Sequence, residues 1–285
     1  MRWEGQRESQ NVEDRRSGGG RRAGGIGLGS LVVALFLGWA LGINPLSILG
    51  VMEDVQQQAT VQEEPAQDIP QNDKQARFVS TILASTEDAW TKIFTADGQT
   101  YTPPKLVLFR GVYPTACGMG QAAMGPFYCP ADEKVYIDLS FYDTLEKQLG
   151  APGEFARAYV IAHEVGHHVQ KLLGVHDEAD RLRRRMSEKE ANALSVRVEL
   201  QADCFAGVWG YMANKQTSMI EAGDVKSGLR AASQIGDDTL QRQSQGRVVP
   251  DSFTHGTSEQ RVHWFKQGLE SGDPAKCDTF SASHL

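Results

Sequence analysis

The sequence has no excess of positive charge, few cysteines and no internal repeat. Its 285 residues carry 29 Lys and Arg against 36 Asp and Glu, which gives a net charge of -7 and a pI near 5.5. Proteins that bind nucleic acids usually present a basic surface, so this balance argues against a nucleic acid as partner. Four cysteines are too few for a small disulfide scaffold. The hydrophobic content of 40% is ordinary for a folded protein.

Charged residues are also missing from one long segment near the N-terminus. Residues 26–43 (IGLGSLVVALFLGWALGI) contain none, and their number is about that needed to cross a bilayer. Four arginines lie shortly before this run, at positions 15, 16, 21 and 22, whereas no Lys or Arg follows it until Lys74. The positive-inside rule then places the N-terminus in the cytoplasm. We therefore expect a single-pass membrane protein whose C-terminal domain is exported.

A cleaved signal peptide and a buried helix both fit the uncharged run less well than a membrane anchor. A signal peptide usually has a shorter apolar core and a small-x-small cleavage site, but here Asn44-Pro45-Leu46 follows and no Ala-x-Ala is present. A buried helix of a soluble core would be weakened by the glycines of the run, which membrane spans tolerate better. An uncleaved anchor is the favoured interpretation.

Composition divides the chain into four parts. Residues 1–25 are rich in Arg, Gly and Glu and poor in apolar residues, which predicts a disordered cytoplasmic tail. Residues 26–52 form the expected transmembrane anchor. Residues 53–73 are rich in Gln and acidic residues and contain two prolines, which is typical of a linker. The folded domain is expected over residues 74–285.

Hydrophobic periodicity predicts an α+β domain that is mainly helical and has a small sheet. Helices are expected over about 75–95, 152–174, 187–212, 218–235 and 257–270, and strands at 106–109 and 135–139. Ser187 with Glu190, and Thr257 with Gln260, have the spacing of capping boxes at two helix starts. The glycine-rich segment 115–130 is expected to be a long ordered loop.

The most informative motif is His163-Glu164-Val165-Gly166-His167, inside the helix expected over 152–174. Two histidines four residues apart project from one helix face, which suits two ligands of one Zn²⁺. The glutamate between them can reach a water at the metal without binding the metal itself. A stripe of apolar residues along this helix predicts that the motif packs against the core.

A catalytic zinc usually has three protein ligands, so one ligand remains to be found. Glu199 and Asp203 lie one turn apart on the next long helix, beside its most apolar part. We expect Glu199 to be the third ligand and Asp203 to accept the outer N–H of a zinc-bound imidazole. The alternative is that both are solvated polar positions on an amphipathic helix.

An H-E-x-x-H followed by E-x-x-x-D resembles the zincin metallopeptidases whose third ligand is a glutamate. The chain is more closely similar to a bacterial family of neutral zinc metallopeptidases. The matching segments are MRWEGQRESQNVEDRR, the uncharged run, GPFYCPADEKVYIDLSF, AHEVGHHVQ, RVELQADCFAGVW and HGTSEQRVHWF. The resemblance covers nearly the whole chain and implies a zincin-like fold with an inner-membrane anchor. It implies no particular substrate.

These residues predict a zinc-dependent peptidase that hydrolyses polypeptides on the periplasmic side. Zn²⁺ held by His163, His167 and Glu199 would lower the pKa of its water towards about 7, and Glu164 would act as general base. One alternative is a non-catalytic envelope protein that keeps zinc in order to bind a partner. A purely structural zinc usually has four protein ligands and would not need Glu164. Another alternative is a zinc amidase that acts on a non-peptide bond.

Two further features bear on substrate binding. His255 precedes a predicted helix start, and a histidine close to the zinc could stabilise an oxyanion, so His255 is a candidate for this role. Zincins bind substrates as an extra strand at a sheet edge, and residues 135–139 are the candidate edge strand. An interior position for this strand stays equally open.

The four cysteines are expected to form two disulfides, because an exported domain meets an oxidising environment. Cys117 and Cys129 flank one glycine-rich loop and should pair, which leaves Cys204 for Cys277. The alternative for Cys204 is a free buried thiol. A zinc site made of four cysteines is disfavoured, because no C-x-x-C spacing is present.

Overall fold

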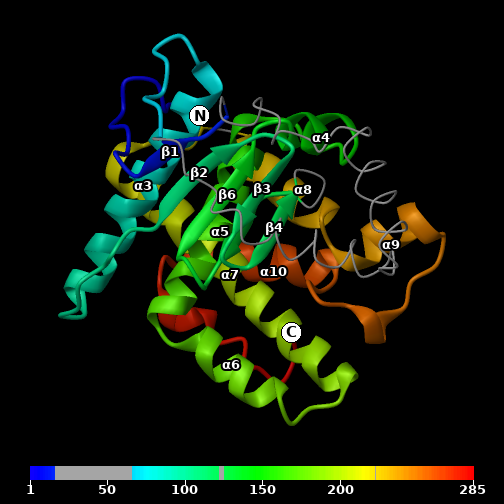
Figure 1. Cartoon of the computed structure of the whole chain (residues 1–285). Coiled ribbons are helices and arrows are strands. Elements are labelled where there is room, and N and C mark those ends of the chain that lie inside the picture. Colours follow the sequence, from blue (N-terminus) through cyan, green and yellow to red (C-terminus); the bar gives the residue numbers. More distant parts are fainter. Residues whose placement is uncertain (17–65, 122–124, 222) are drawn as a thin grey trace, which may run out of the picture.

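The computed structural model describes residues 1–16, 66–121, 125–221 and 223–285. Helices make up most of this part of the chain and lie around one small sheet (Figure 1), so the predicted α+β class with a small sheet is confirmed at that level. The predicted anchor over 26–52 lies outside the described residues. Within the described ranges, no helix combines the length and apolar character that a membrane crossing requires.

The main sheet has four strands in the order β1-β2-β6-β5. The strands are β1 (Val12–Asp14), β2 (Lys105–Phe109), β5 (Phe127–Cys129) and β6 (Lys134–Asp138), and a separate hairpin is formed by β3 (Val112–Thr115) and β4 (Gly118–Gln121). β1 and β6 run parallel to β2, whereas β5 is antiparallel to β6. The two predicted strands are confirmed. The candidate edge strand β6 is an interior strand, and the outer strand beside it is β5.

The sequence interpretation of residues 115–130 as one loop is wrong in part, because this segment contains β4 and β5. Each of these strands is short and pairs with a neighbouring strand through backbone hydrogen bonds. Glycines and small side chains within them hide the alternation on which strand prediction depends. The pairing therefore becomes visible only in three dimensions.

The helices are α3 (Lys74–Ala96), α4 (Phe141–Lys147), α5 (Glu154–Leu172), α6 (Val175–Arg183), α7 (Glu188–Thr217), α8 (Asp224–Gln234), α9 (Asp237–Gln245) and α10 (Ser258–Ser271), with short 3-10 turns at Pro250–Ser252 and Pro274–Cys277. The five predicted helices are present, and α4, α6 and α9 are additional helices that were not predicted. Both capping boxes are present, at Ser187 for α7 and at Thr257 for α10. Each satisfies two otherwise unpaired N–H groups and determines where its helix begins.

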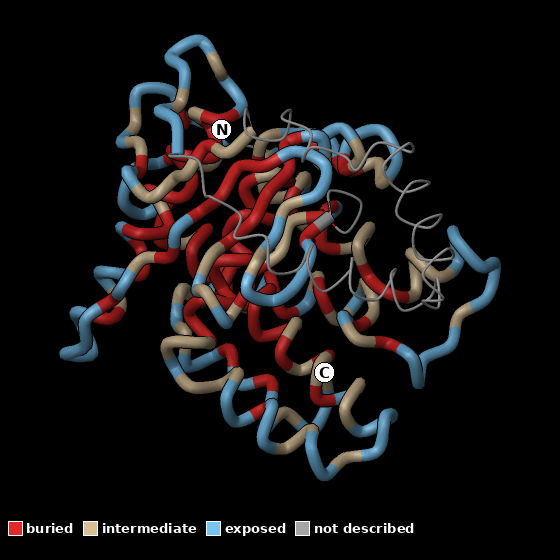
Figure 2. Tube along the Cα trace, viewed as in Figure 1, coloured by how far each residue is buried: buried red, intermediate tan, exposed pale blue. Residues whose placement is uncertain are grey.

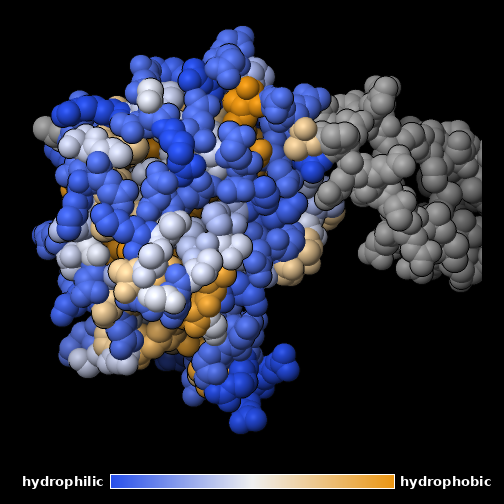
Figure 3. All heavy atoms as spheres, turned by 90° about the vertical axis from the view of Figure 1, so that its left-hand side faces the viewer, coloured by the Kyte–Doolittle hydropathy of each residue, from blue (hydrophilic) through white to orange (hydrophobic). Residues whose placement is uncertain are grey.

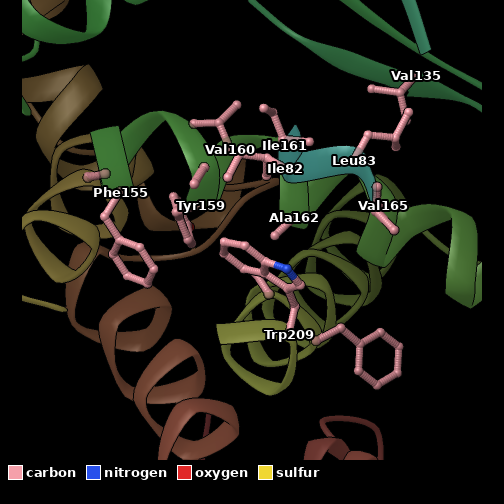
Figure 4. Packing of buried hydrophobic residues seen from close by; sticks show 14 of the residues in the cluster. Ile82, Leu83, Val135, Phe155, Tyr159, Val160, Ile161, Ala162, Val165 and Trp209 are labelled. Carbon is pink, nitrogen blue, oxygen red and sulfur yellow. The ribbon is translucent and has the colours of Figure 1, made fainter. Parts of the chain in front are cut away.

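The core lies where α5 packs between the sheet and α7. Figure 4 shows Ile161, Ala162 and Val165 of α5 near Trp209 of α7, with Ile82 of α3 close by. All five side chains are almost completely buried. In Figure 2 the buried parts of the tube run through the sheet and these central helices, while the loops around them are exposed. The helix that carries the histidine motif is therefore central to the fold.

The first sixteen residues are part of this domain. Trp3 is 5% exposed, contacts Phe78 edge to face at 5.3 Å, and donates a hydrogen bond from Nε1 to Glu154. β1 pairs with β2 and covers one edge of β2, whose backbone N–H and C=O groups would otherwise be unpaired. The prediction of a disordered tail over 1–25 is therefore wrong for residues 1–16. The prediction took low apolar content as a sign of disorder, whereas most of the contacts of this segment are ion pairs and backbone hydrogen bonds.

The last residues of the predicted linker 53–73 also belong to the domain. The backbone N–H of Gln67 donates to the carbonyl of Asp14. Asp73 caps α3 through the N–H of Ala76, and its other carboxylate oxygen lies 2.7 Å from Arg16. The domain thus begins before Lys74 and includes the chain on both sides of residues 17–65.

Both predicted disulfides are confirmed, and the alternative of a free Cys204 is wrong. Cys117 pairs with Cys129, and Cys204 pairs with Cys277, with Cα–Cα distances of 5.8 and 5.6 Å. The second bond ties the C-terminal segment to α7. The face shown in Figure 3 is mainly hydrophilic, with smaller hydrophobic areas between the charged side chains.

Candidate metal centre

The histidine motif occupies the middle of α5, where nearly every side chain is buried. His163, Glu164 and His167 line a cavity beside the helix. Histidine and glutamate are costly to bury unless they have polar partners or a metal. Their position on one face of a core helix therefore indicates a functional site.

Gly166, between the two histidines, lets α7 come close to α5. A Cβ atom placed on Gly166 would lie 2.9 Å from the carbonyl oxygen of Ala202 in α7, a distance that real side chains avoid. The backbones can therefore approach only because position 166 has no side chain. This approach brings Glu199, one turn before Ala202, to the histidines.

Three side chains meet as a possible metal-ligand set. The Nε2 atom of His163 lies 3.2 Å from one carboxylate oxygen of Glu199, and Nε2 of His167 lies 3.5 Å from the other. One ligand atom from each residue falls within 4.8 Å of the others. Two imidazoles and one carboxylate are the donor set that catalytic zinc often has. The structure thus brings together the three predicted ligands.

Neighbouring acceptors determine which nitrogen of each imidazole is free. Nδ1 of His163 lies 2.8 Å from Asp203, and Nδ1 of His167 lies 2.9 Å from the side-chain oxygen of Gln170. Carboxylate and amide oxygens only accept hydrogen bonds, so each Nδ1 carries the proton. Both Nε2 atoms face Glu199, where a bound metal ion would take the place of a proton between the imidazoles and the carboxylate. These protonation states fit a divalent zinc ion.

Asp203 is the centre of a buried polar cluster. Nε and Nη2 of Arg261 donate to its two oxygens at 2.8 and 2.9 Å, and the hydroxyl of Tyr159 donates to Oδ1. Burial alone would raise the pKa of Asp203, but the charges of Arg261 and His163 outweigh it and lower the pKa to about 2. Asp203 is therefore a carboxylate, as its contact with His163 requires.

Glu164 lies in the same cavity and is 7% exposed. Burial is the largest influence and raises the pKa of Glu164, against the opposing effect of His163 and His167. A carboxyl group whose pKa is raised towards neutrality can both accept and return a proton. This is the property that a general base requires.

The cavity has a volume of about 450 Å³, and apolar residues line it together with the polar ones. Phe127 and Tyr128 of β5 line it, together with Phe141, Leu149 and Val160. β5 has no strand beyond it in the four-stranded sheet. An outer strand therefore forms one wall of the candidate site, in the place where residues 135–139 were expected.

His255 reaches this cavity from the loop before α10. Its Nδ1 lies 3.1 Å from one oxygen of Asp237, whose other oxygen accepts backbone N–H groups from residues 254–256. The hydrogen bond to Asp237 is the main cause that raises the pKa of His255. The structure thus brings the candidate oxyanion stabiliser to the site, where Asp237 favours its protonated form.

The sequence interpretation gave no role to Tyr159, Gln170, Asp237 or Arg261. Tyr159 lies four residues before His163 and Gln170 three after His167, so their helical spacing was an available signal. Asp237 and Arg261 come from distant elements, and nothing in their spacing connects them to the motif. Arg261 reaches the site because its helix, α10, packs closely against α7, where Gly268 lies against the backbone of Cys204.

A family profile described as "Putative neutral zinc metallopeptidase" matches residues 1–280 of the chain. The chain belongs to this family. Among similar proteins, YpfJ of Escherichia coli K12 is 54% identical over 291 residues, which cover 99% of this chain and 100% of YpfJ. Rv2575 of Mycobacterium tuberculosis H37Rv and Mb2605 of Mycobacterium bovis are 42% identical over 219 residues, with 73% of each chain covered. All three are described as uncharacterized proteins, and no solved structure matches the chain.

Proposed function

We propose that the protein is a membrane-attached zinc metallopeptidase with a zincin-like active site on the periplasmic side. The observation that carries this proposal is the meeting of three ligand side chains and a buried glutamate on one wall of a cavity. Membership of a zinc metallopeptidase family supports the reaction class. The two disulfides favour an oxidising compartment, and the uncharged run 26–43 favours attachment to a membrane.

His163, His167 and Glu199 would hold the zinc ion. When bound, zinc supplies a Lewis acid that lowers the pKa of water and polarises a carbonyl group. Glu164 accepts the proton of the attacking water and delivers it to the leaving amine. Asp203 and Gln170 keep the imidazoles in the required orientation. His255, protonated beside Asp237, donates a hydrogen bond to the oxyanion that develops on the substrate.

The substrate is a polypeptide that lies along β5. An outer strand presents unpaired N–H and C=O groups, to which an extended peptide can bind as a further strand. Phe127 and Tyr128 of this strand already form part of the cavity wall. The bound peptide would therefore pass directly in front of Glu164.

Two other functions compete with this proposal. A protein that keeps zinc only to bind a partner has no use for a buried glutamate that lines the same cavity as its metal ligands. A zinc amidase that acts on a non-peptide bond would use the same residues, and substrate profiling separates it from a peptidase.

The test is the substitution Glu164→Gln in the full-length protein. Hydrolysis of a peptide library should fall about 100- to 10,000-fold, which is the usual contribution of a general base. Zinc content should stay at one ion per chain, because Glu164 is not a ligand. Glu270→Gln is the matched control, since Glu270 is exposed on α10 and should tolerate the change. Full activity of the Glu164→Gln protein would contradict the proposed chemistry.

A further inference from the structure

The two ends of the segment 17–65 are held at the same place in the domain. Before it, β1 pairs with β2 and the guanidinium of Arg16 contacts Asp14 and Asp73. After it, the N–H of Gln67 donates to the carbonyl of Asp14. The described residues on either side of this segment therefore lie beside one strand. This segment contains the uncharged run 26–43.

Residues 1–16 are bound to the domain along their whole length. Trp3 is buried against α3 and hydrogen-bonded to Glu154 at the start of α5. Arg7 lies 2.9 Å from Glu87 and 2.7 Å from Asp88. Ser9 donates to the buried side of Glu87 and accepts, through its backbone oxygen, from Ser80. These contacts require that residues 1–16 and the rest of the domain share one compartment.

We propose that the protein attaches to the membrane from one side only, with residues 1–16 and 66–285 on the same face of the bilayer. A single crossing would separate the two parts by about 30 Å of hydrocarbon and would remove β1 from its sheet. This inference rests on the membrane attachment proposed above, and it replaces the expected cytoplasmic N-terminus.

Two of the four arginines that suggested a cytoplasmic tail, Arg15 and Arg16, have partners in the fold. Arg15 lies 3.2 Å from Glu13 of β1, and Arg16 is paired with Asp14 and with Asp73. The contact between Arg16 and Asp73 links the end of β1 to the start of α3. The positive-inside rule was derived for loops that flank a membrane span, whereas these two residues belong to a folded sheet edge.

Cysteine labelling in intact bacterial cells tests the proposal on the full-length chain. Glu4→Cys and Lys189→Cys each introduce one thiol at an exposed side chain, the first in the N-terminal segment and the second at the start of α7. A membrane-impermeant maleimide is applied before and after permeabilisation, and the unsubstituted chain gives the background from its own cysteines. We expect both thiols to show the same protection. Labelling of one before permeabilisation and the other only after it would overturn the proposal.

A cross-link gives a second measurement on the same membranes. The carboxylate of Glu4 lies 2.7 Å from the ammonium of Lys74, so the pair Glu4→Cys and Lys74→Cys should be joined by a short bis-maleimide. Each single variant is the control. A cross-linked peptide that joins positions 4 and 74 supports attachment from one side, and failure to form it in folded, membrane-bound protein contradicts it.

The outcomes separate this inference from the proposed function. If both thiols are protected in intact cells, one-sided attachment holds and the periplasmic placement of the peptidase is wrong. If the protein is recovered entirely in the soluble fraction, the membrane attachment itself is wrong, and the inference fails with it. Peptidase activity that depends on Glu164 is independent of either result.

Discussion

At the scale of single residues, the site depends on hydrogen bonds that fix protonation states. Asp203 and Gln170 hold the Nδ1 protons of the two histidines, and Asp237 holds His255. A neutral imidazole can bind a metal through Nε2, whereas a protonated imidazole can only donate hydrogen bonds. Histidine side chains therefore have two different roles in one cavity. Two of them can bind a metal, and His255 can donate a hydrogen bond, according to the acceptor beside each ring.

Substitution of Asp237 should shift the pH dependence of activity. Asp237 raises the pKa of His255, so the Asp237→Asn change should lower it. Because the proposed role of His255 requires its proton, activity is lost as the pH rises through this pKa. The alkaline limb of the kcat/KM profile should therefore move to lower pH, while the acidic limb should stay unchanged. His255→Gln, which cannot titrate, should remove the effect of Asp237→Asn altogether, and an unaltered limb would exclude His255 from the reaction.

At the scale of elements, the close approach of α5 and α7 brings Glu199 to the histidines. Gly166 permits this approach. The residues that make up the site could be predicted from the sequence only in part. The motif, Glu199 and both capping boxes could be identified because their residues are close in sequence and have helical spacing. The contacts of Arg261 could not, since Asp203 is 58 residues away and His163 is 98 residues away. Strand β1 was missed because its partner, β2, is distant in sequence, and β5 because it is short and lies in a segment of glycines and small residues.

Gly166→Ala should destabilise the protein and weaken zinc binding. The added methyl group would press against the backbone of Ala202, and overpacking of this kind costs about 1 to 3 kcal/mol. Helix propensity alone predicts the opposite sign, since alanine favours helix over glycine by about 1 kcal/mol. Urea unfolding with and without zinc measures both effects. A more stable Gly166→Ala protein with unchanged zinc affinity would show that the helices are not in close contact here.

Trp3→Ala tests whether the N-terminal segment belongs to the folded element. Removal of a buried tryptophan should cost about 3 to 5 kcal/mol, whereas truncation of a side chain in a disordered tail should cost nothing. Glu4→Ala, at an exposed neighbouring position, is the control. The midpoint of chemical unfolding measures the difference, and equal midpoints for the two variants would contradict the described packing.

At the scale of the whole molecule, the two disulfides close loops of different length. Cys117 and Cys129 are 12 residues apart, whereas Cys204 and Cys277 are 73 apart. Loop-closure entropy predicts stabilisation of about 3 kcal/mol for the shorter loop and about 4 kcal/mol for the longer. Replacement of both Cys204 and Cys277 by serine should therefore lower the free energy of unfolding more than replacement of Cys117 and Cys129. Urea titrations of the two double variants decide this, and the reverse order would contradict it.

The pairing of these cysteines could be predicted because Cys117 and Cys129 flank one short glycine-rich loop, which leaves the remaining two for each other. The side of the membrane on which residues 1–16 lie could not be predicted in this way. It depends on whether residues 1–16 fold with the domain, and that follows from ion pairs and strand pairing between segments far apart in sequence. Composition described this segment as polar, but it could not show that its polar groups have partners.

A chain of amide groups links His167 to the end of the molecule. His167 donates to the side-chain oxygen of Gln170, whose nitrogen donates to Gln201, whose nitrogen in turn donates to the backbone oxygen of Cys277. Every donor in this series of hydrogen bonds points towards Cys277. Reversal of one side-chain amide would break the hydrogen bonds on both sides of it. The nitrogen of Gln170 also donates to the backbone oxygen of Val198, so two backbone carbonyls, which can only accept, set the direction. The C-terminal segment, through the oxygen of Cys277, thus helps to determine which nitrogen of the His167 ring is available to a metal.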